Sequence, residues 1–393
     1  MTGIAGMRGT LDWATDERPK NFREMILWRN PNGKAPLTAL MSRMKSESVD
    51  DPEFSWWEEE LNAIRVTMDA TGASASSTAF GLTSGGLDLV PGDILLVEKT
   101  ETATYDNELV EVSSITSDTA IVVKRGAAGT TAAVTGASAN LTKIGNVYEE
   151  GSTSPEASTR NPTKLTNYCQ IFKTSYEITN TAKNTRTRTG DPLKNDKKRK
   201  MFDHSVAMEF AWMFGVPYED TSGNKPKRFT GGLRNFINTN VTVFATTPTE
   251  DTLLEAIYPV FDYDAGNAGS ERIVFAGNGF LNSLNKLAKD SSSTRVNFDG
   301  IVKTYGMNLQ QWVLPQGTLY VRTHPLMNTH ARFTNSAFVI DPSAIIYRYM
   351  RDTKMQDNIQ ANDADEQKGQ WLTEAGLEIR HEKTMAYMGN FVV

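Results

Sequence analysis

The sequence predicts an α+β fold that also contains a small all-β insert. Three observations support this prediction. A helical pattern runs from 192 to 214, short β-type runs separated by turn residues fill the region from about 70 to 145, and strand and helix patterns alternate from about 228 onward. The chain has 393 residues, so we expect two or three packing units rather than one core.

Composition and charge exclude several classes of protein. Hydrophobic residues make up 39% of the chain and the formal net charge is −6, so no basic field over the whole chain indicates a nucleic-acid-binding protein. Cys169 is the one cysteine, which excludes an intrachain disulfide framework. The first 20 residues lack a long apolar run, and no run approaches the ~20 residues of a membrane span. We therefore expect a soluble protein made in a reducing compartment such as a cytoplasm.

The chain begins with a polar segment, residues 1–55, that is punctuated by proline and contains scattered apolar anchors such as "REMILWRN". It is predicted to be an extended arm that needs a partner surface to become ordered. Residues 56–69 follow within "EFSWWEEELNAIRVTM", where apolar and polar residues alternate as in a strand. This strand contains Trp56 and Trp57, which are candidate residues for contacts with another molecule.

Residues 70–145 differ in composition from the rest. Two segments of small polar residues enclose the β-type runs "PGDILLVEKT", "NELVEVSSI" and "TAIVVKR". The region contains no His or Cys, and its carboxylates lie in turns or on alternating faces. We expect an independent β module without catalytic chemistry.

Residues 146–189 are predicted to form a long hairpin with a polar tip at about 153–163, whose return strand is "YCQIFKTSYEIT". A hairpin of this kind cannot bury its own apolar face, so we expect it to need a neighbour, which is either the rest of this chain or another copy. Its candidate contact residues are Tyr148, Glu149, Glu150 and Lys164.

The region 190–227 contains the long helix. Asp191 and Pro192 are typical of an N-cap and a first helical position, while Gly215 before Pro217 predicts the end, with glycine as a left-handed cap. Apolar residues recur at helical spacing and predict the face that packs on the core. They are Phe202, Val206, Phe210 and Met213, widened by Met201, Met208 and Trp212.

The start of this helix carries five cations, where the helix dipole disfavours positive charge. They are Lys194, Lys197, Lys198, Arg199 and Lys200. Their crowding predicts an anionic neighbour, which is either a subunit's carboxylates or a polyanion bound without sequence preference. A solvated face with no partner is the third interpretation.

From residue 228 to 340 the sequence predicts an α/β region, with a helix in "TEDTLLEAIYPVFDYDAG" that has Leu254, Ile257 and Phe261 on one face. A strand, a glycine turn and a second helix follow in "ERIVFAGNGFLNSLNKLAK". Residues 341–393 add return strands, with a long polar loop expected in "MQDNIQANDADEQKGQW".

No catalytic, metal-binding or cofactor-binding residues are predicted. "GNGFLN" has only two of the three glycines of a dinucleotide turn, because Asn282 stands at the third position. The four histidines are scattered, without a metal-binding pair or a nucleophile and base. The sequence offers nothing in favour of an enzyme.

The order of these parts resembles the major capsid proteins of tailed bacteriophages, whose fold is shared with encapsulins and the floor of herpesvirus capsids. "IGNVYEEG", "NYCQIFKTSYEIT" and "AMEFAWMFG" resemble the hairpin, its return strand and the spine helix, and "KGQWLTEAGLEIRHEKTMAYMGNF" is similar to the closing strands. The similarity is greatest to the subgroup with a β-rich insert before the extended loop. It covers roughly residues 55 to 393.

The resemblance implies a domain assignment. Residues 146–189 would be the extended loop across a neighbouring subunit, 190–227 the spine of the peripheral domain and 228–340 most of the axial domain. The closing strands at 341–393 would return to both domains. Some relatives join subunits through a Lys–Asn isopeptide bond, but no partner for Lys164 is identified in this sequence.

The resemblance also implies a structural protein that assembles into hexamers and pentamers of an icosahedral or prolate head shell. Its partners would be further copies of itself, portal and scaffolding proteins, a decoration protein, and packaged double-stranded DNA held by non-specific contacts. We expect no cofactor and no membrane partner, and assembly in the host cytoplasm into the virion capsid. The alternative is a sequence-independent nucleic-acid-binding protein that uses the basic segment 194–200.

Overall fold

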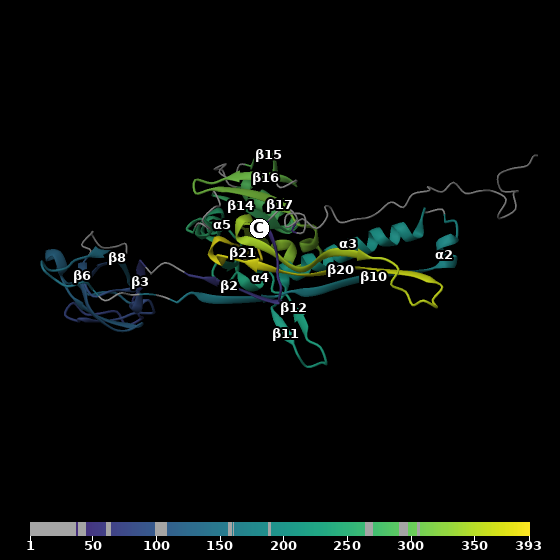
Figure 1. Ribbon diagram of the computed structural model, residues 1–393. Helices are drawn as coiled ribbons and strands as arrows, with labels where there is room; N and C mark the ends of the chain where they lie inside the picture. Colours follow the sequence, from purple (N-terminus) through teal and green to yellow (C-terminus); the bar gives the residue numbers. More distant parts are fainter. Residues whose placement is uncertain are drawn as a thin grey trace, which may run out of the picture. The chain divides into compact units, whose positions relative to one another are not determined.

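The computed structural model describes residues 37, 45–59, 64–98, 108–155, 159, 161–187, 190–263, 270–290, 298–304 and 307–393 (Figure 1). Most of the arm expected at 1–55 lies outside these residues. The chain divides into two compact units. One unit is Trp57–Lys164, and the other combines Met1–Trp56 with Leu165–Val393.

The unit Trp57–Lys164 is a small β-barrel. Its six strands follow the order β3-β8-β5-β6-β7-β4. Backbone hydrogen bonds close the barrel between its first and last strands, since Asp69 N–H donates to the Gly81 carbonyl and Thr83 N–H to the Thr67 carbonyl, both at 2.9 Å. The strands are β3 (Arg65–Thr67), β4 (Ala79–Gly81), β5 (Asp93–Val97), β6 (Glu108–Ser117), β7 (Ala120–Lys124) and β8 (Asn140–Asn146).

Alternating residues of these strands fill the barrel, as the period of two requires. Leu95, Val110 and Leu141 are fully buried there. A buried ion pair closes one end, where Arg125 Nη2 lies 2.6 Å from Glu108 Oε2. The all-β insert is thus confirmed, although it begins with β3, before residue 70. The chain enters the barrel beside the strand by which it leaves, because Lys143 N–H on β8 donates to the carbonyl of Ile64, just before β3, at 2.7 Å.

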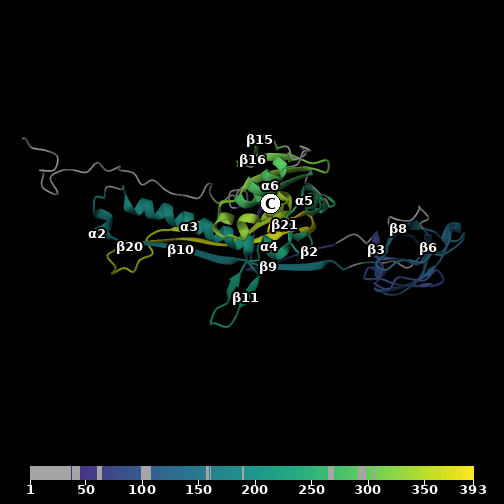
Figure 2. The ribbon, with the colours of Figure 1, turned by 180° about the vertical axis from the view of Figure 1, so that it is seen from behind.

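The larger unit has a four-stranded sheet in the order β1-β19-β20-β10. It comprises β1 (Ser46–Ser48), β19 (Ile345–Gln356), β20 (Glu366–Ile379) and β10 (Gln170–Thr179). The helices α2 (Asn180–Asn184) and α3 (Pro192–Phe214) follow β10, and α3 lies along β10 and β20 (Figure 2).

The prediction of a loop over residues 355–371 is wrong in its extent. Strand β19 continues to Gln356 and β20 begins at Glu366, so only 357–365 connect them. Both strand ends are mostly polar, with only Met355 and Trp371 apolar, and no alternating apolar pattern therefore reveals them. Antiparallel pairing continues to Gln356 opposite Gln370.

A seven-stranded mixed sheet holds the α/β region, in the order β13-β21-β18-β14-β17-β16-β15. Its strands are β13 (Val241–Val243), β14 (Glu271–Ala276), β15 (Phe298–Thr304), β16 (Met307–Val313), β17 (Thr318–Thr323), β18 (Ala337–Ile340) and β21 (Ala386–Gly389). The helices of this region are α4 (Leu233–Phe236), α5 (Glu250–Ile257) and α6 (Asn278–Asp290).

The predicted strand, glycine turn and helix are confirmed as β14 and α6. Gly277 is required by close packing, because a Cβ there would lie 2.3 Å from the Thr334 carbonyl oxygen. Helix α5 begins with a capping box between Thr249 and Thr252. Its fully buried residues are Leu253, Ala256 and Ile257 rather than the predicted set with Leu254 and Phe261, which are only partly buried.

The predicted hairpin at 146–189 has a different strand pairing. Strand β9 (Thr163–Tyr168) pairs with β2 (Glu53–Glu58), and β10 pairs with β20. The described residues between β8 and β9 form no strand. The pair therefore joins segments about a hundred residues apart in sequence, with the barrel inserted between them. A second short pair, β11 (Tyr218–Asp220) and β12 (Lys227–Phe229), follows α3.

Candidate functional site

The helix α3 positions most of the predicted site residues. The Asp191 carboxylate accepts the backbone N–H groups of Leu193 at 2.9 Å and Lys194 at 3.3 Å, as an N-cap should. Both predicted ends of the helix are confirmed. The prediction of a left-handed cap is wrong, because Gly215 has φ −62°. Glycine is needed there for space, since a Cβ would lie 2.2 Å from the Thr230 carbonyl oxygen.

The buried face of α3 differs from the predicted stripe. Met208, Trp212 and Met213 are buried as expected, but Met201 is exposed. Phe202, Val206 and Phe210 are only half-buried. The remaining places on the buried face belong to two polar residues, His204 and Glu209.

His204 lies between α3 and the sheet. Its Nδ1 lies 3.1 Å from the hydroxyl of Thr174 on β10, and its Nε2 lies 2.8 Å from the hydroxyl of Thr373 on β20. The Phe172 ring stands edge-on at 6.4 Å. Burial lowers the pKa of His204, because a charged imidazole would lose its hydration in this interface. The ring therefore joins helix and sheet in its neutral form.

Glu209 connects three segments that are distant in sequence. Its Oε1 lies 2.7 Å from Nε2 of His324 and accepts the backbone N–H of Leu37, also at 2.7 Å. All three residues are buried. Leu37 is thus hydrogen-bonded to the C-terminal half of α3.

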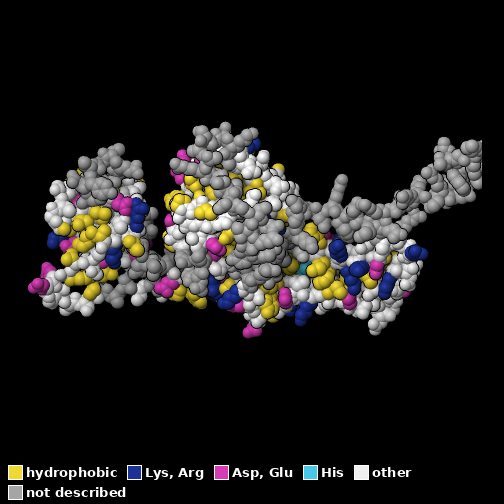
Figure 3. Space-filling view, turned by 90° about the horizontal axis from the view of Figure 1, so that it is seen from above, with side chains coloured by type: hydrophobic (Ala, Val, Ile, Leu, Met, Phe, Trp, Pro, Cys, Tyr) yellow, Lys and Arg dark blue, Asp and Glu magenta, His cyan; other side chains and the backbone are white. Residues whose placement is uncertain are grey.

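The basic start of α3 has anionic neighbours within its own chain. Lys197 Nζ lies 2.9 Å from Asp357 Oδ1, in the connection between β19 and β20, and 5.2 Å from the centre of the Tyr176 ring. Lys200 lies 3.6 Å from Asp203. The side chains of Lys194, Lys198 and Arg199 are exposed. Lys and Arg side chains gather with hydrophobic ones over this end of the unit (Figure 3).

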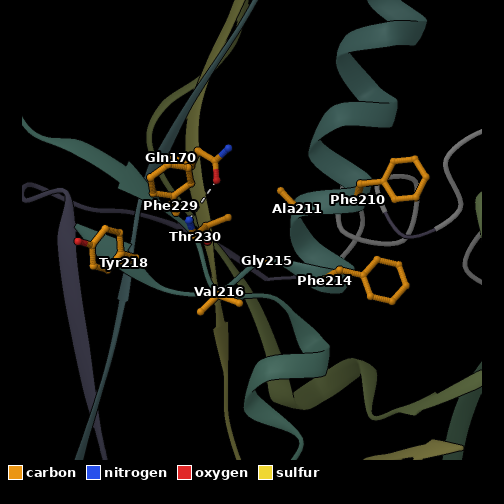
Figure 4. Close-up of a pocket in the computed structure, with 9 residues that line it drawn as sticks. All are labelled: Gln170, Phe210, Ala211, Phe214, Gly215, Val216, Tyr218, Phe229 and Thr230. Carbon is orange, nitrogen blue, oxygen red and sulfur yellow. Dashed lines mark hydrogen bonds between the residues drawn. The ribbon is translucent and has the colours of Figure 1, made fainter. Parts of the chain in front are cut away.

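An open depression of about 480 Å³ lies at the other end of α3 (Figure 4). We call it the aromatic depression, because Phe210 and Phe214 of α3 and Tyr218 and Phe229 of the β11–β12 hairpin are among its lining residues. Its lining residues are Gln170, Phe210, Ala211, Phe214, Gly215, Val216, Tyr218, Phe229 and Thr230. The sequence analysis missed this feature, because Tyr218 and Phe229 lie at opposite ends of the hairpin sequence and form no local pattern.

The two tryptophans have opposite environments. Trp56 is buried and packs against Phe54 at 6.2 Å and Phe236 at 5.7 Å between ring centres. Its contacts lie within its own chain, so it belongs to the core. Trp57 is 64% exposed.

The remaining candidates lie in the smaller unit. The Tyr148 hydroxyl donates to the Pro91 carbonyl at 3.2 Å, and Glu149, Glu150 and Lys164 are exposed. Among the described residues no group of His, Cys, Asp and Glu side chains could hold a metal ion, and no helix is long and apolar enough for a membrane span.

The sequence matches the family of the SU10 major capsid protein over residues 5–391, which is almost the whole chain. The chain belongs to this family. The major capsid protein of Pseudomonas phage PaMx41 is 26% identical over 368 residues, covering 91% of this chain and 85% of that protein.

Solved capsid structures resemble this capsid protein at low sequence identity. The capsid of an empty GTA particle has a TM-score of 0.48 at 8% identity, covering 97% of this chain and 98% of that one. The SrpI encapsulin complex of Synechococcus elongatus PCC 7942 has a TM-score of 0.42 at 10% identity, covering 59% and 76%.

Family membership confirms the expected α+β capsid protein fold and the structural function. This SU10-type capsid protein is a shell component that assembles with copies of itself, and its place is the virion capsid. It is a structural protein rather than an enzyme.

Proposed function

We propose that this capsid protein forms hexamers and pentamers that close an icosahedral or prolate head shell around double-stranded DNA. The observation that carries the proposal is the family match over residues 5–391, which includes both compact units. The pairing of β2 with β9 adds support, because an isolated two-stranded pair is marginally stable in water and gains order from a neighbouring surface.

The domain roles follow from this proposal. The helix α3 and the sheet β1-β19-β20-β10 form the peripheral domain, and the seven-stranded sheet forms the axial domain at the capsomer centre. The β2–β9 pair is the extended loop, and the barrel is an insert within it. The insert faces outward or lies between capsomers.

The basic start of α3 faces a carboxylate-rich edge of an adjacent copy. The side chains of Lys194, Lys198 and Arg199 are exposed, and these like charges crowd the positive end of the helix dipole, where an anion from another molecule would be favoured. Packaged DNA is the other anion that such a cluster would bind, in a salt-dependent way and without sequence preference.

Other proteins of the particle complete the assembly: a portal protein, a scaffolding protein and a decoration protein. The exposed residues Tyr148, Glu149, Glu150 and Lys164 supply further contacts between subunits.

Purified chain produced without other phage proteins tests the proposal. We expect sedimentation and negative-stain electron microscopy to find capsomers or shells of many copies. A chain that stays monomeric at high concentration, even when a scaffolding protein is supplied, would contradict it. Nuclease protection of co-purified DNA then measures genome retention separately from shell formation.

A further inference from the structure

Trp57 is an anchor without a partner in the described structure of its own chain. On β2 the side chains alternate, with Phe54 and Trp56 buried and Ser55 and Trp57 directed away. Trp57 leaves 64% of its surface exposed, more than the other described tryptophans. A large apolar side chain of this kind contributes most when a neighbouring surface covers it, and tryptophan is enriched among such anchors in protein interfaces.

The aromatic depression is a receptor of suitable chemistry. Val216 is 61% exposed, Tyr218 59% and Phe229 45%. Figure 4 shows Tyr218 and Phe229 on one side of the depression and α3 on the other, with the rings of Phe210 and Phe214 directed away from the hairpin. The close approach of Gly215 to Thr230 holds the hairpin against the end of α3 and leaves this hollow. Its volume of about 480 Å³ is large enough to receive an indole ring, and it is open to solvent on one side.

Charges beside the two features are complementary. Glu58 and Glu59 follow Trp57 directly, and Glu59 is exposed. The β11–β12 hairpin carries three cations against two carboxylates, and one of each is joined where Arg228 Nε lies 2.8 Å from Glu219 Oε1. Lys225 and Lys227 are exposed on the β11–β12 hairpin, which borders the depression.

We propose that Trp57 of one copy seats in the aromatic depression of a second copy, with Glu58 and Glu59 directed towards Lys225 and Lys227. This inference rests on the proposed assembly into capsomers and names the surfaces that join two copies. The two patches are different, so the contact is heterologous, and repetition of such a contact around an axis closes a ring. Each subunit gives one tryptophan and receives one.

A disulfide test distinguishes contacts between copies from contacts within one chain. The native Cys169 should contribute little background cross-linking, because burial raises the pKa of its thiol to about 12. We would assemble a mixture of two variants, Trp57→Cys and Phe229→Cys, and oxidise it. We expect a cross-linked dimer in the mixture and none in either variant alone. Leu87→Cys mixed with Phe229→Cys is the matched control, since Leu87 is equally exposed at 61% but lies on the barrel.

The double variant, with both cysteines in one chain, should give a ladder of oligomers on a non-reducing gel. A monomer of altered mobility would overturn the inference, because it would place Trp57 against the depression of its own chain. Equal cross-linking by Leu87→Cys would overturn it as well.

An assembly titration gives the second measurement. Trp57→Ala should raise the chain concentration needed for shells at least about tenfold, as loss of an interface anchor does. Leu87→Ala should leave it unchanged, and equal melting temperatures would show that both variants fold. Glu59→Lys should weaken assembly, and Lys225→Glu in the same chain should restore it.

These measurements distinguish a failure of this inference from a failure of the proposed function. If wild-type chain forms shells and Trp57→Ala forms them at the same concentration, the inference is wrong and the proposed function stands. If wild-type chain forms no shells with a scaffolding protein present, both are wrong.

Discussion

The Nε2 atom of His204 lies 2.8 Å from the hydroxyl oxygen of Thr373, and that hydroxyl lies 2.8 Å from the hydroxyl of Thr353. A buried histidine therefore links the middle of α3 to two adjacent strands. A neutral ring can form both hydrogen bonds. A charged ring would be buried with only hydroxyl groups as hydrogen-bond partners and, among the described residues, no carboxylate beside it to compensate its charge. Several consequences for stability and assembly are open to measurement.

Acidification should loosen α3 from its sheet. Burial lowers the pKa of His204, so the unfolded chain binds the proton more readily than the folded one. The free energy of unfolding should fall as pH drops below about 6.5, the ordinary histidine pKa, and the loss should level off below the folded-state pKa. Its slope is at most about 1.4 kcal/mol per pH unit for one proton.

Urea unfolding from pH 7.5 to 5 measures this effect in wild type and in His204→Gln. The exposed His330, changed to Gln, serves as the control. The variant at position 204 should lose part of the pH dependence, and the control should keep it. Identical profiles for all three proteins would refute the assignment.

Breaking the buried contact between Glu209 and His324 should be costly. Glu209→Leu leaves the imidazole and the Leu37 N–H without the carboxylate, and removal of one partner from such a pair costs about 3–5 kcal/mol. Denaturant unfolding measures the loss. The double variant Glu209→Leu with His324→Phe should recover much of it, because both polar groups are then absent.

Neutralising the basic start of α3 should separate two kinds of partner. Changing Lys197, Lys198, Arg199 and Lys200 to Gln should impair assembly even without DNA, because subunit carboxylates are the expected neighbour. Sedimentation measures shell formation, and nuclease protection measures retained DNA. Normal empty shells with poor retention would favour DNA instead, and no change in either would indicate a solvated face.

The control for that variant is Lys197→Gln alone. It removes the partly exposed pair with Asp357, which is worth about 0–1 kcal/mol, and the contact with the Tyr176 ring. Assembly should be unchanged. A defect as large as that of the fourfold variant would show that the β19–β20 connection, and not a second molecule, needs the cation.

The barrel should fold on its own. The fragment Trp57–Lys164 contains a closed strand order and a contiguous apolar core. We expect a β-type circular dichroism spectrum and one cooperative melting transition. Leu95→Ala should destabilise the fragment by about 2–5 kcal/mol, as for other fully buried leucines. A fragment without cooperative melting would show that the barrel depends on the rest of the chain.

Local sequence signals predicted the ends of α3 well and its buried face poorly. Asp191, Pro192 and Gly215 mark the ends through backbone chemistry that acts within a few residues. The buried face depends on partners far away in the chain. His204 and Glu209 are buried because Thr373 and His324 satisfy them, and hydrophobic spacing counts such polar residues as surface.

The pairing of strands that are distant in the sequence also could not be predicted from the sequence. The alternation in β9 and β10 indicated strands, but their partners β2 and β20 are set by tertiary contacts. The aromatic depression belongs to the same class of feature. Its residues are unremarkable one by one, and the approach of Gly215 to Thr230 brings them together.

The barrel receives and returns the chain at adjacent points, where Lys143 N–H meets the Ile64 carbonyl. An element with neighbouring ends can be inserted into a connection without changing the distance that the connection must span. Recombination could therefore add, delete or replace this module while the host fold keeps its strand pairing. For the same reason, the site is a natural place to graft a foreign domain with similarly close termini and display it in many copies on a particle.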